Sequence, residues 1–160
     1  MANLTVEDRM ELHEIAACYG DLIDLRDWEG LARVFTEDAV FDATDLGMPL
    51  LEGLNAIRDY MDKSPNHPLG HHITNIYVET TGDEITLRSR IIAAGHRGRV
   101  SSASYRDRVV KTERGWRIRH RVRTLRRTWR VPSKAESGAS RRARGVSFAS
   151  RTVGLLILDG

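Results

Sequence analysis

Apolar residues recur at helical spacing along the first 25 residues of the chain. Thr5 is a plausible N-cap, and Asp8 three residues later makes the pattern close to the capping box that begins a helix. We therefore predict a first helix from Thr5 to about Leu25 with one buried face. That face consists of Ile15, Ala16, Tyr19, Leu22 and Ile23.

Two shorter helices are predicted before the main strands begin. Asp27 followed by Trp28 fits an N-cap and the start of a second helix, which ends near Phe35. A third helix follows Gly53, because the apolar residues within 54–61 again have helical spacing.

The second half of the chain changes to a period of two. Alternate residues from Ile85 to Ala93 are apolar or small, which is typical of a strand with one buried face. Comparable strands cover about residues 71–79, 100–111 and 116–131, and a short strand begins near residue 39. Tight-turn residues join the later strands, so the pattern predicts an antiparallel sheet in an α+β domain.

The regular pattern ends at Pro132. Residues 133–145 are rich in Ser, Gly and basic residues and lack apolar periodicity, so they do not predict a packed element. We therefore predict one domain over residues 1–131 and a basic, flexible C-terminal tail over residues 132–160.

Charge is unevenly distributed along the chain, although the net charge is only +3. Residues 1–60 hold 4 Lys or Arg against 14 Asp or Glu, whereas residues 97–130 hold 13 against 2. We interpret this asymmetry as acidic helices packing beside basic strands, within or between subunits. A nucleic-acid or protein adaptor is the alternative. Nucleic acid is disfavoured as a partner, because the basic segment has few aromatic residues to stack on bases and no nucleic-acid motif.

No apolar run approaches the ~20 residues that a membrane-spanning helix needs. The first ten residues lack the apolar core of a signal peptide, and Cys18 is the only cysteine, which excludes an intrachain disulfide. We therefore expect a cytoplasmic protein that does not contact a membrane.

Short motifs follow one another in a fixed order between residues 4 and 130. They are Tyr19, Asp24, Asp27-Trp28, Phe35-Thr36-Glu37-Asp38-Ala39-Val40, Leu51-Glu52-Gly53, His71-His72-Ile73-Thr74-Asn75 and Gly115-Trp116-Arg117-Ile118. Their order and spacing resemble the SnoaL-like group of the nuclear-transport-factor-2-like superfamily, which includes bile acid dehydratases, scytalone dehydratases and dehydrochlorinases. The resemblance implies a cone in which a curved antiparallel sheet packs against three N-terminal helices and encloses a deep pocket.

His71 is the first candidate catalytic residue, because a histidine with a pKa near ~6.5 can take and return protons near neutrality. The resemblance implies that His71 is a general base. It also implies that Asp24 is the carboxylate that fixes the tautomer of His71 and stabilises its imidazolium. The structural alternatives are a half-buried, hydrogen-bonded histidine at a strand start and an acidic residue that caps its helix or pairs with Arg26.

Tyr19 is the third candidate catalytic residue, because its hydroxyl could donate to a substrate carbonyl oxygen and stabilise developing enolate charge. A core tyrosine is the alternative, since Tyr19 lies within the apolar stripe of the first helix. Strict alternation places Asn75 and Tyr77 on the strand face of His71, where they could contact substrate or simply belong to the core.

Arg121 matches an arginine that lines the pocket in the dehydrochlorinase branch. The strand pattern points the other way, because a regular strand would place all four arginines of residues 117–123 on one face. Four arginines rarely share a dry pocket. Either a β-bulge rotates Arg121 inward, or His120, on the face of Trp116, takes its place.

We therefore expect cofactor-independent acid–base chemistry on an apolar alicyclic or polycyclic small molecule, and a lyase that dehydrates a hydroxy-ketone fits best. A ketosteroid-isomerase-like isomerase uses the same first proton transfer and stays open, as does a non-catalytic binding or interaction module. The six histidines lack metal-ligand spacing, so we expect no metal and no cofactor. We also expect a homodimer or homotrimer formed through the outer face of the sheet.

Overall fold

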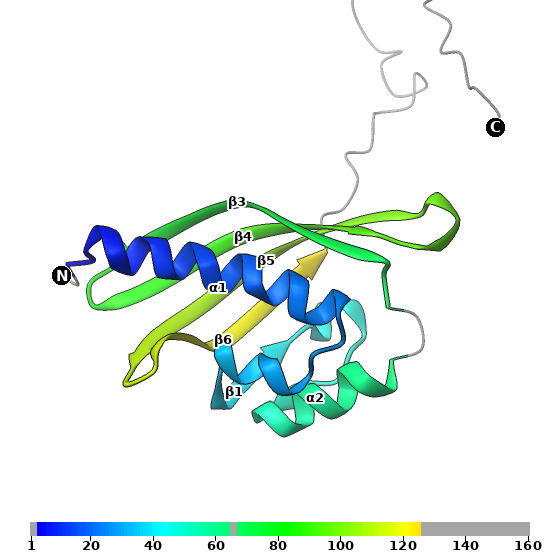
Figure 1. The fold of residues 1–160 in the computed structure, drawn as a ribbon, viewed down its shortest axis with the longest axis horizontal. Helices are drawn as coiled ribbons and strands as arrows, with labels where there is room; N and C mark the ends of the chain where they lie inside the picture. The colour runs from blue at the N-terminus through cyan, green and yellow to red at the C-terminus, as the bar shows by residue number, and fades with distance from the viewer. Residues whose placement is uncertain (1–2, 65–66, 126–160) are drawn as a thin grey trace, which may run out of the picture. The chain divides into compact units, whose positions relative to one another are not determined.

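Helices and strands follow one another in nearly the predicted order in the computed structural model (Figure 1), which describes residues 3–64 and 67–125. The elements are α1 (Val6–Asp24), η1 (Glu29–Arg33), β1 (Phe35–Asp42), η2 (Thr44–Leu46), β2 (Leu51–Glu52), α2 (Leu54–Lys63), β3 (Gly70–Thr81), β4 (Glu84–Ala94), η3 (His96–Gly98), β5 (Val100–Thr112) and β6 (Gly115–Leu125). The predicted tail, residues 132–160, and the domain boundary before it lie outside the described residues.

The six strands form one mixed sheet in the order β2-β1-β6-β5-β4-β3. Neighbouring strands are antiparallel except β1 and β6, which run parallel. The prediction of a wholly antiparallel sheet is therefore wrong. β1 pairs with β6, the last strand in sequence, which lies far along the chain. Short-range alternation does not specify such a long-range pairing or its direction.

The second predicted helix is not an α-helix. η1 is a five-residue 3-10 helix, so within residues 3–64 and 67–125 two α-helices rather than three accompany the sheet. The Asp27 side chain does accept the predicted capping hydrogen bond, from the Gly30 N–H at 2.8 Å. A Cβ atom on Gly30 would clash with the Asp27 carboxylate, so a larger residue there would have to displace the capping side chain.

Helix α1 lies along one face of the sheet (Figure 1). Its predicted apolar face is confirmed, because Ile15, Tyr19, Leu22 and Ile23 are all buried. The helix approaches β3 closely at Gly20, where an added Cβ atom would lie 2.9 Å from the His71 carbonyl oxygen. This close contact holds the start of β3 beside the C-terminal turns of α1.

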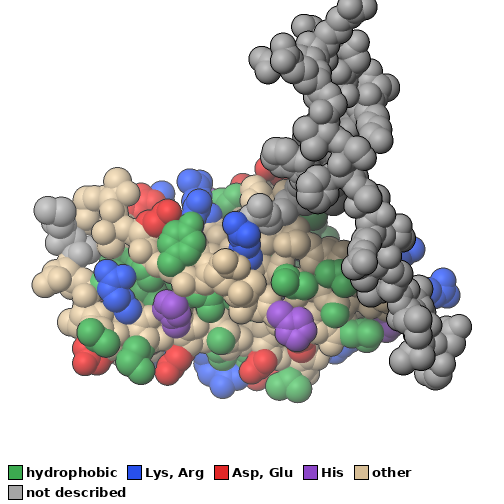
Figure 2. All heavy atoms as spheres, turned by 90° about the horizontal axis from the view of Figure 1, so that it is seen from above, with side chains coloured by type: hydrophobic (Ala, Val, Ile, Leu, Met, Phe, Trp, Pro, Cys, Tyr) green, Lys and Arg blue, Asp and Glu red, His purple; other side chains and the backbone are tan. Residues whose placement is uncertain are grey.

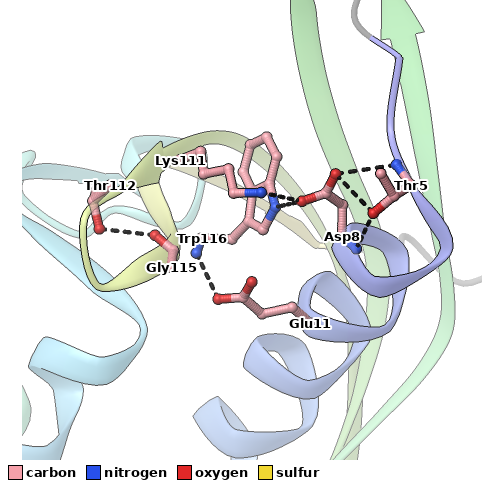
Figure 3. A network of polar contacts seen from close by, with 7 residues as sticks. All are labelled: Thr5, Asp8, Glu11, Lys111, Thr112, Gly115 and Trp116. Carbon is pink, nitrogen blue, oxygen red and sulfur yellow. Dashed lines mark hydrogen bonds and ion pairs between the residues drawn. The ribbon is translucent and has the colours of Figure 1, made fainter.

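The N-terminus of α1 is tied to the β5–β6 hairpin by a polar network (Figure 3). The predicted capping box is present, with the Asp8 carboxylate accepting from the Thr5 N–H at 3.0 Å. The same carboxylate accepts from Lys111 Nζ at 2.6 Å and from the Trp116 indole at 2.9 Å. Glu11 accepts from the Trp116 backbone N–H at 2.7 Å. The hydrogen bond from Lys111 holds the pKa of Asp8 well below its usual range.

The face shown in Figure 2 carries basic, acidic and histidine side chains interspersed with apolar ones. No helix in the described part of the chain is long and apolar enough to cross a membrane.

Candidate active site

The last residue of α1 and the start of β3 form a hydrogen-bonded pair. The Asp24 carboxylate accepts from His71 Nδ1 at 2.6 Å and from the His71 backbone N–H at 2.8 Å. Both side chains retain contact with solvent, at 10% exposure for His71 and 26% for Asp24. Because the carboxylate accepts from Nδ1–H, the second ring nitrogen, Nε2, is left as the basic atom of a neutral imidazole.

Burial lowers the pKa of His71 below its ordinary value of 6.5, and this effect outweighs the raising effect of Asp24. The nearby charges of His67 and Arg123 lower it further. His71 is therefore mainly neutral at neutral pH, which is the form that accepts a proton.

Arg121 faces inward because β6 contains a β-bulge. Arg108 of β5 pairs with His120, but the next residue, Val109, pairs with Ile118, so Arg119 is an extra residue in β6. The bulge reverses the alternation, and Arg121 is only 1% exposed. Of the two alternatives left open by the sequence, the structure has the bulge.

The same bulge places His120 on the outer face of the sheet. There it lines a hollow of about 90 Å³ together with Arg106 and Arg108. The expectation that His120 lies on the face of Trp116 is therefore wrong, and the four arginines of residues 117–123 do not share one face.

Asp107 is the partner of Arg121, and sequence reasoning missed it. Arg121 donates from Nε and Nη2 to the two carboxylate oxygens of Asp107 at 2.8 and 2.7 Å. Asp107 is completely buried. A signal was present in the sequence, because Asp107 occupies a buried-face position of β5, and a buried carboxylate requires a partner of opposite charge.

Tyr19 packs against this ion pair. The Arg121 guanidinium carbon lies 4.0 Å from the ring centroid of Tyr19 and 4.1 Å from that of Tyr105. Tyr19 also makes edge-to-face contacts with Tyr105 and with Phe35, each at 5.8 Å between centroids. Burial raises the pKa of Tyr105 well above its usual range, so its hydroxyl stays protonated. Tyr19 thus lies in a buried cation–π cluster, next to the arginine that the resemblance implicated.

Asn75 and Tyr77 do not follow the face of His71, because β3 also contains a bulge. Thr74 pairs with Arg90 and Tyr77 with Arg88, so two residues of β3 oppose one residue of β4. Asn75 has a positive φ of 50°, and Tyr77 is 49% exposed. The bulge therefore shifts the alternation by one residue, and the Asn75 and Tyr77 side chains lie away from the face of His71, contrary to the expectation.

Asn75 and Tyr77 instead line a cavity of about 620 Å³ on the outer face of the sheet, with Arg88, Arg90 and Arg106 among its other residues. Neither His71 nor Asp24 lines this cavity. The deep pocket beside α1 that the resemblance implies stays a prediction. Within the described residues, no group of three or more His, Cys, Asp or Glu side chains could hold a metal ion.

The SnoaL-like domain family matches residues 4–122. The chain belongs to that family. It is 34% identical over 133 residues to an uncharacterized protein of Mycobacterium tuberculosis, and the match covers 74% of this chain and 86% of the relative. Membership confirms the resemblance found in the motifs.

Solved structures with this fold include two from Novosphingobium aromaticivorans. A protein named as a candidate aromatic ring hydroxylase is 27% identical, with a TM-score of 0.66 and coverage of 77% of this chain and 92% of the other. A protein named as a candidate scytalone dehydratase is 22% identical, with a TM-score of 0.60 and coverage of 74% and 83%. The second similarity shows the fold alone.

Proposed function

We propose that this SnoaL-like protein is a cofactor-independent lyase that removes water from a cyclic hydroxy-ketone. The observation that supports this most directly is the His71–Asp24 pair. It combines a short hydrogen bond, a fixed tautomer and a lowered pKa, which together suit a general base. The name of one structural neighbour, a candidate aromatic ring hydroxylase that is 27% identical to this chain, adds support for a cyclic small-molecule substrate.

In the proposed reaction, His71 Nε2 takes the proton from the carbon next to the substrate carbonyl. The C–H electron pair forms an enolate, and Asp24 stabilises the resulting imidazolium. The enolate collapses to a C=C bond as the C–O bond of the β-hydroxyl breaks. The imidazolium returns its proton to the departing oxygen, so that water leaves and the base is regenerated.

Tyr19 and Arg121 are proposed to stabilise the developing enolate oxygen, directly or through the cation–π cluster that they form. Asn75, Tyr77 and His120 lie on the outer face, which favours a role in assembly or surface binding over contact with the reacting atoms. An isomerase, which would return the proton to another carbon, is the second candidate because it uses the same base. A binding-only module is the third.

The test is exchange of deuterium from solvent into the carbon next to the carbonyl of cyclic ketones and hydroxy-ketones, followed by NMR. Enone formation is followed in parallel by absorbance. We expect His71→Ala to abolish both signals, while His72→Ala, an exposed neighbour on the same strand, retains them. Exchange without enone would indicate an isomerase, and no exchange by the wild-type protein would refute proton-transfer chemistry.

Asp24→Asn tests the tautomer. The His71 backbone N–H must keep an acceptor, so the single amide oxygen of asparagine is expected to serve it. The amide NH₂ would then face Nδ1 and move the ring proton to Nε2, where it blocks the base. We expect a loss of about 10²–10⁴-fold in exchange rate, against little change for Asp21→Asn, an exposed residue of the same helix.

A further inference from the structure

Buried hydrogen-bond donors without partners point to a site on the inner face of the sheet. Ser89 Oγ, Arg121 Nη1 and Arg123 Nε are each buried without a hydrogen-bond partner in the described part of the chain. Ser89 and Arg121 are themselves only 4% and 1% exposed. Because leaving such groups unsatisfied costs free energy, unpartnered donors mark positions where a ligand's hydrogen-bond acceptors would be stabilised.

The strand register brings these donors together. Ser89 of β4 pairs with Tyr105 of β5, and Tyr105 pairs with Arg123 of β6, so the three residues form one row across the sheet. Directly opposed residues on neighbouring strands share a face, and Tyr105 belongs to the buried face. Arg121 lies two residues before Arg123 on β6 and contacts the Tyr105 ring. Ser89 and Arg123 therefore flank Tyr105 on the same face of the sheet, and Arg121 contacts its ring.

Counting only residues that the structure describes, the two arginines of this site carry one unpaired positive charge. Asp107 neutralises Arg121 through two hydrogen bonds. Arg123 is half-buried and has no carboxylate partner among the described residues. Its charge contributes to the lowered pKa of His71, and it opposes the rise that burial causes in the pKa of Tyr105. The Arg123 charge therefore acts on both the candidate base and Tyr105 of the aromatic cluster.

We propose that Arg123, with the Ser89 hydroxyl and the free Nη1 of Arg121, binds a carboxylate group of the substrate. A carboxylate supplies one negative charge to match the one unpaired cation, and its two oxygens offer enough acceptor sites for the three donors. A phosphate dianion would leave one charge uncompensated in a half-buried site. The inference deepens the proposed function, on which it rests, by defining the substrate as a cyclic hydroxy-ketone that carries a carboxylate.

Binding can be tested without turnover by titrating the full chain with cyclohexanecarboxylate or its neutral isostere, cyclohexanecarboxamide. The readout is the NMR signal of the His71 ring. We expect the wild-type protein to prefer the carboxylate, and Arg123→Gln to weaken carboxylate binding by about 10–100-fold while changing carboxamide binding little. Arg119→Gln is the matched control on the same strand, because Arg119 pairs with Asp38 at the exposed surface.

Arg123→Gln should also raise the pKa of His71 in the free protein, because the arginine charge lowers it. Asp24 and His67 remain in place and supply the other charges around that ring. Bound carboxylate should raise the same pKa in the wild-type protein. Arg123→Lys, which keeps the charge, should retain part of the affinity even if the glutamine variant folds poorly.

Equal affinity of the wild-type protein for carboxylate and carboxamide would overturn the proposal, as would unchanged carboxylate affinity in folded Arg123→Gln. The proposed lyase activity can be refuted independently of the carboxylate site. His71→Ala should lose proton exchange but keep carboxylate binding, measured by calorimetry, so either result can occur without the other.

Discussion

The buried Asp107–Arg121 pair makes a quantitative prediction about stability. Asp107→Asn would leave the Arg121 charge buried without a counter-charge, since Arg121 and Asp107 side chains are 1% and 0% exposed. Removing one partner of such a pair typically costs about 3–5 kcal/mol of unfolding free energy. For a domain of this size, about 1 kcal/mol corresponds to a shift of roughly 4 °C in Tm, so the expected fall is roughly 12–20 °C.

The same strand supplies the control. Arg119 and Asp38 form an ion pair of similar length, 2.9 Å, but their side chains are 57% and 60% exposed. Exposed pairs contribute only about 0.2–1 kcal/mol, so Asp38→Asn should lower Tm by no more than roughly 4 °C. Thermal and urea unfolding of both variants at pH 7 would measure the difference.

A second comparison separates lost charge from lost packing. The double variant Asp107→Asn, Arg121→Met removes the uncompensated cation but keeps an unbranched side chain between the two tyrosine rings. It should therefore be more stable than Asp107→Asn alone. If Asp107→Asn costs no more than Asp38→Asn, or if the double variant is the less stable of the two, the argument from burial is wrong.

Four further outcomes are expected. The proton-exchange rate should fall as pH drops through the lowered pKa of His71, so the midpoint of the pH profile should lie below 6.5. Asp24→Asn should move that midpoint lower still, because Asp24 raises the pKa of His71. A wild-type midpoint above 6.5 would contradict the lowered pKa. The depressed pKa of Asp8 contributes stability that is present above the unfolded carboxyl pKa of about 3.9 and lost as pH falls below it. The difference in urea midpoint between wild type and Asp8→Asn should therefore shrink toward pH 2. A difference that stays constant with pH would refute the stabilising role of the Asp8 carboxylate. Arg106→Glu on the outer face should weaken the expected homo-oligomer in light scattering, whereas a wild-type monomer at micromolar concentration, insensitive to salt, would exclude the oligomer. Truncation after Val131 should leave the Tm and ligand binding unchanged. A lower Tm together with lost binding would assign the tail a role in binding.

Regular elements with strong local signals were predictable from the sequence. The capping box and apolar stripe of α1 were predicted, as was the alternation of β4, where residues from Ile85 to Ala93 are buried in turn. In each case neighbouring residues alone determine the outcome, because helix caps and strand alternation act over a few residues. The contact between Asp24 and His71 came from the family resemblance, since no local rule relates residues 47 positions apart.

The two bulges could not be predicted in the same way. A bulge adds one residue to a strand, and its position depends on pairing with a neighbouring strand rather than on local propensity. Asn75 gave a weak signal, because asparagine adopts positive φ more readily than most residues. Arg119 gave none. Each bulge reverses the face of every later residue in its strand, so Tyr77 and His120 were assigned to the wrong side.

The bulge in β6 determines more of the candidate site than any single side chain does. Without the extra residue at Arg119, regular alternation would turn His120 and Val122 toward the core, and Arg121 and Arg123 toward the outer face. The ion pair with Asp107, the stacking on Tyr19 and Tyr105, and the row of unpartnered donors would then all be lost together. A single backbone irregularity therefore brings Arg121, which Asp107 neutralises, and Arg123, which has no carboxylate partner among the described residues, to the same face of the sheet. The proposed carboxylate site beside His71 depends on this arrangement.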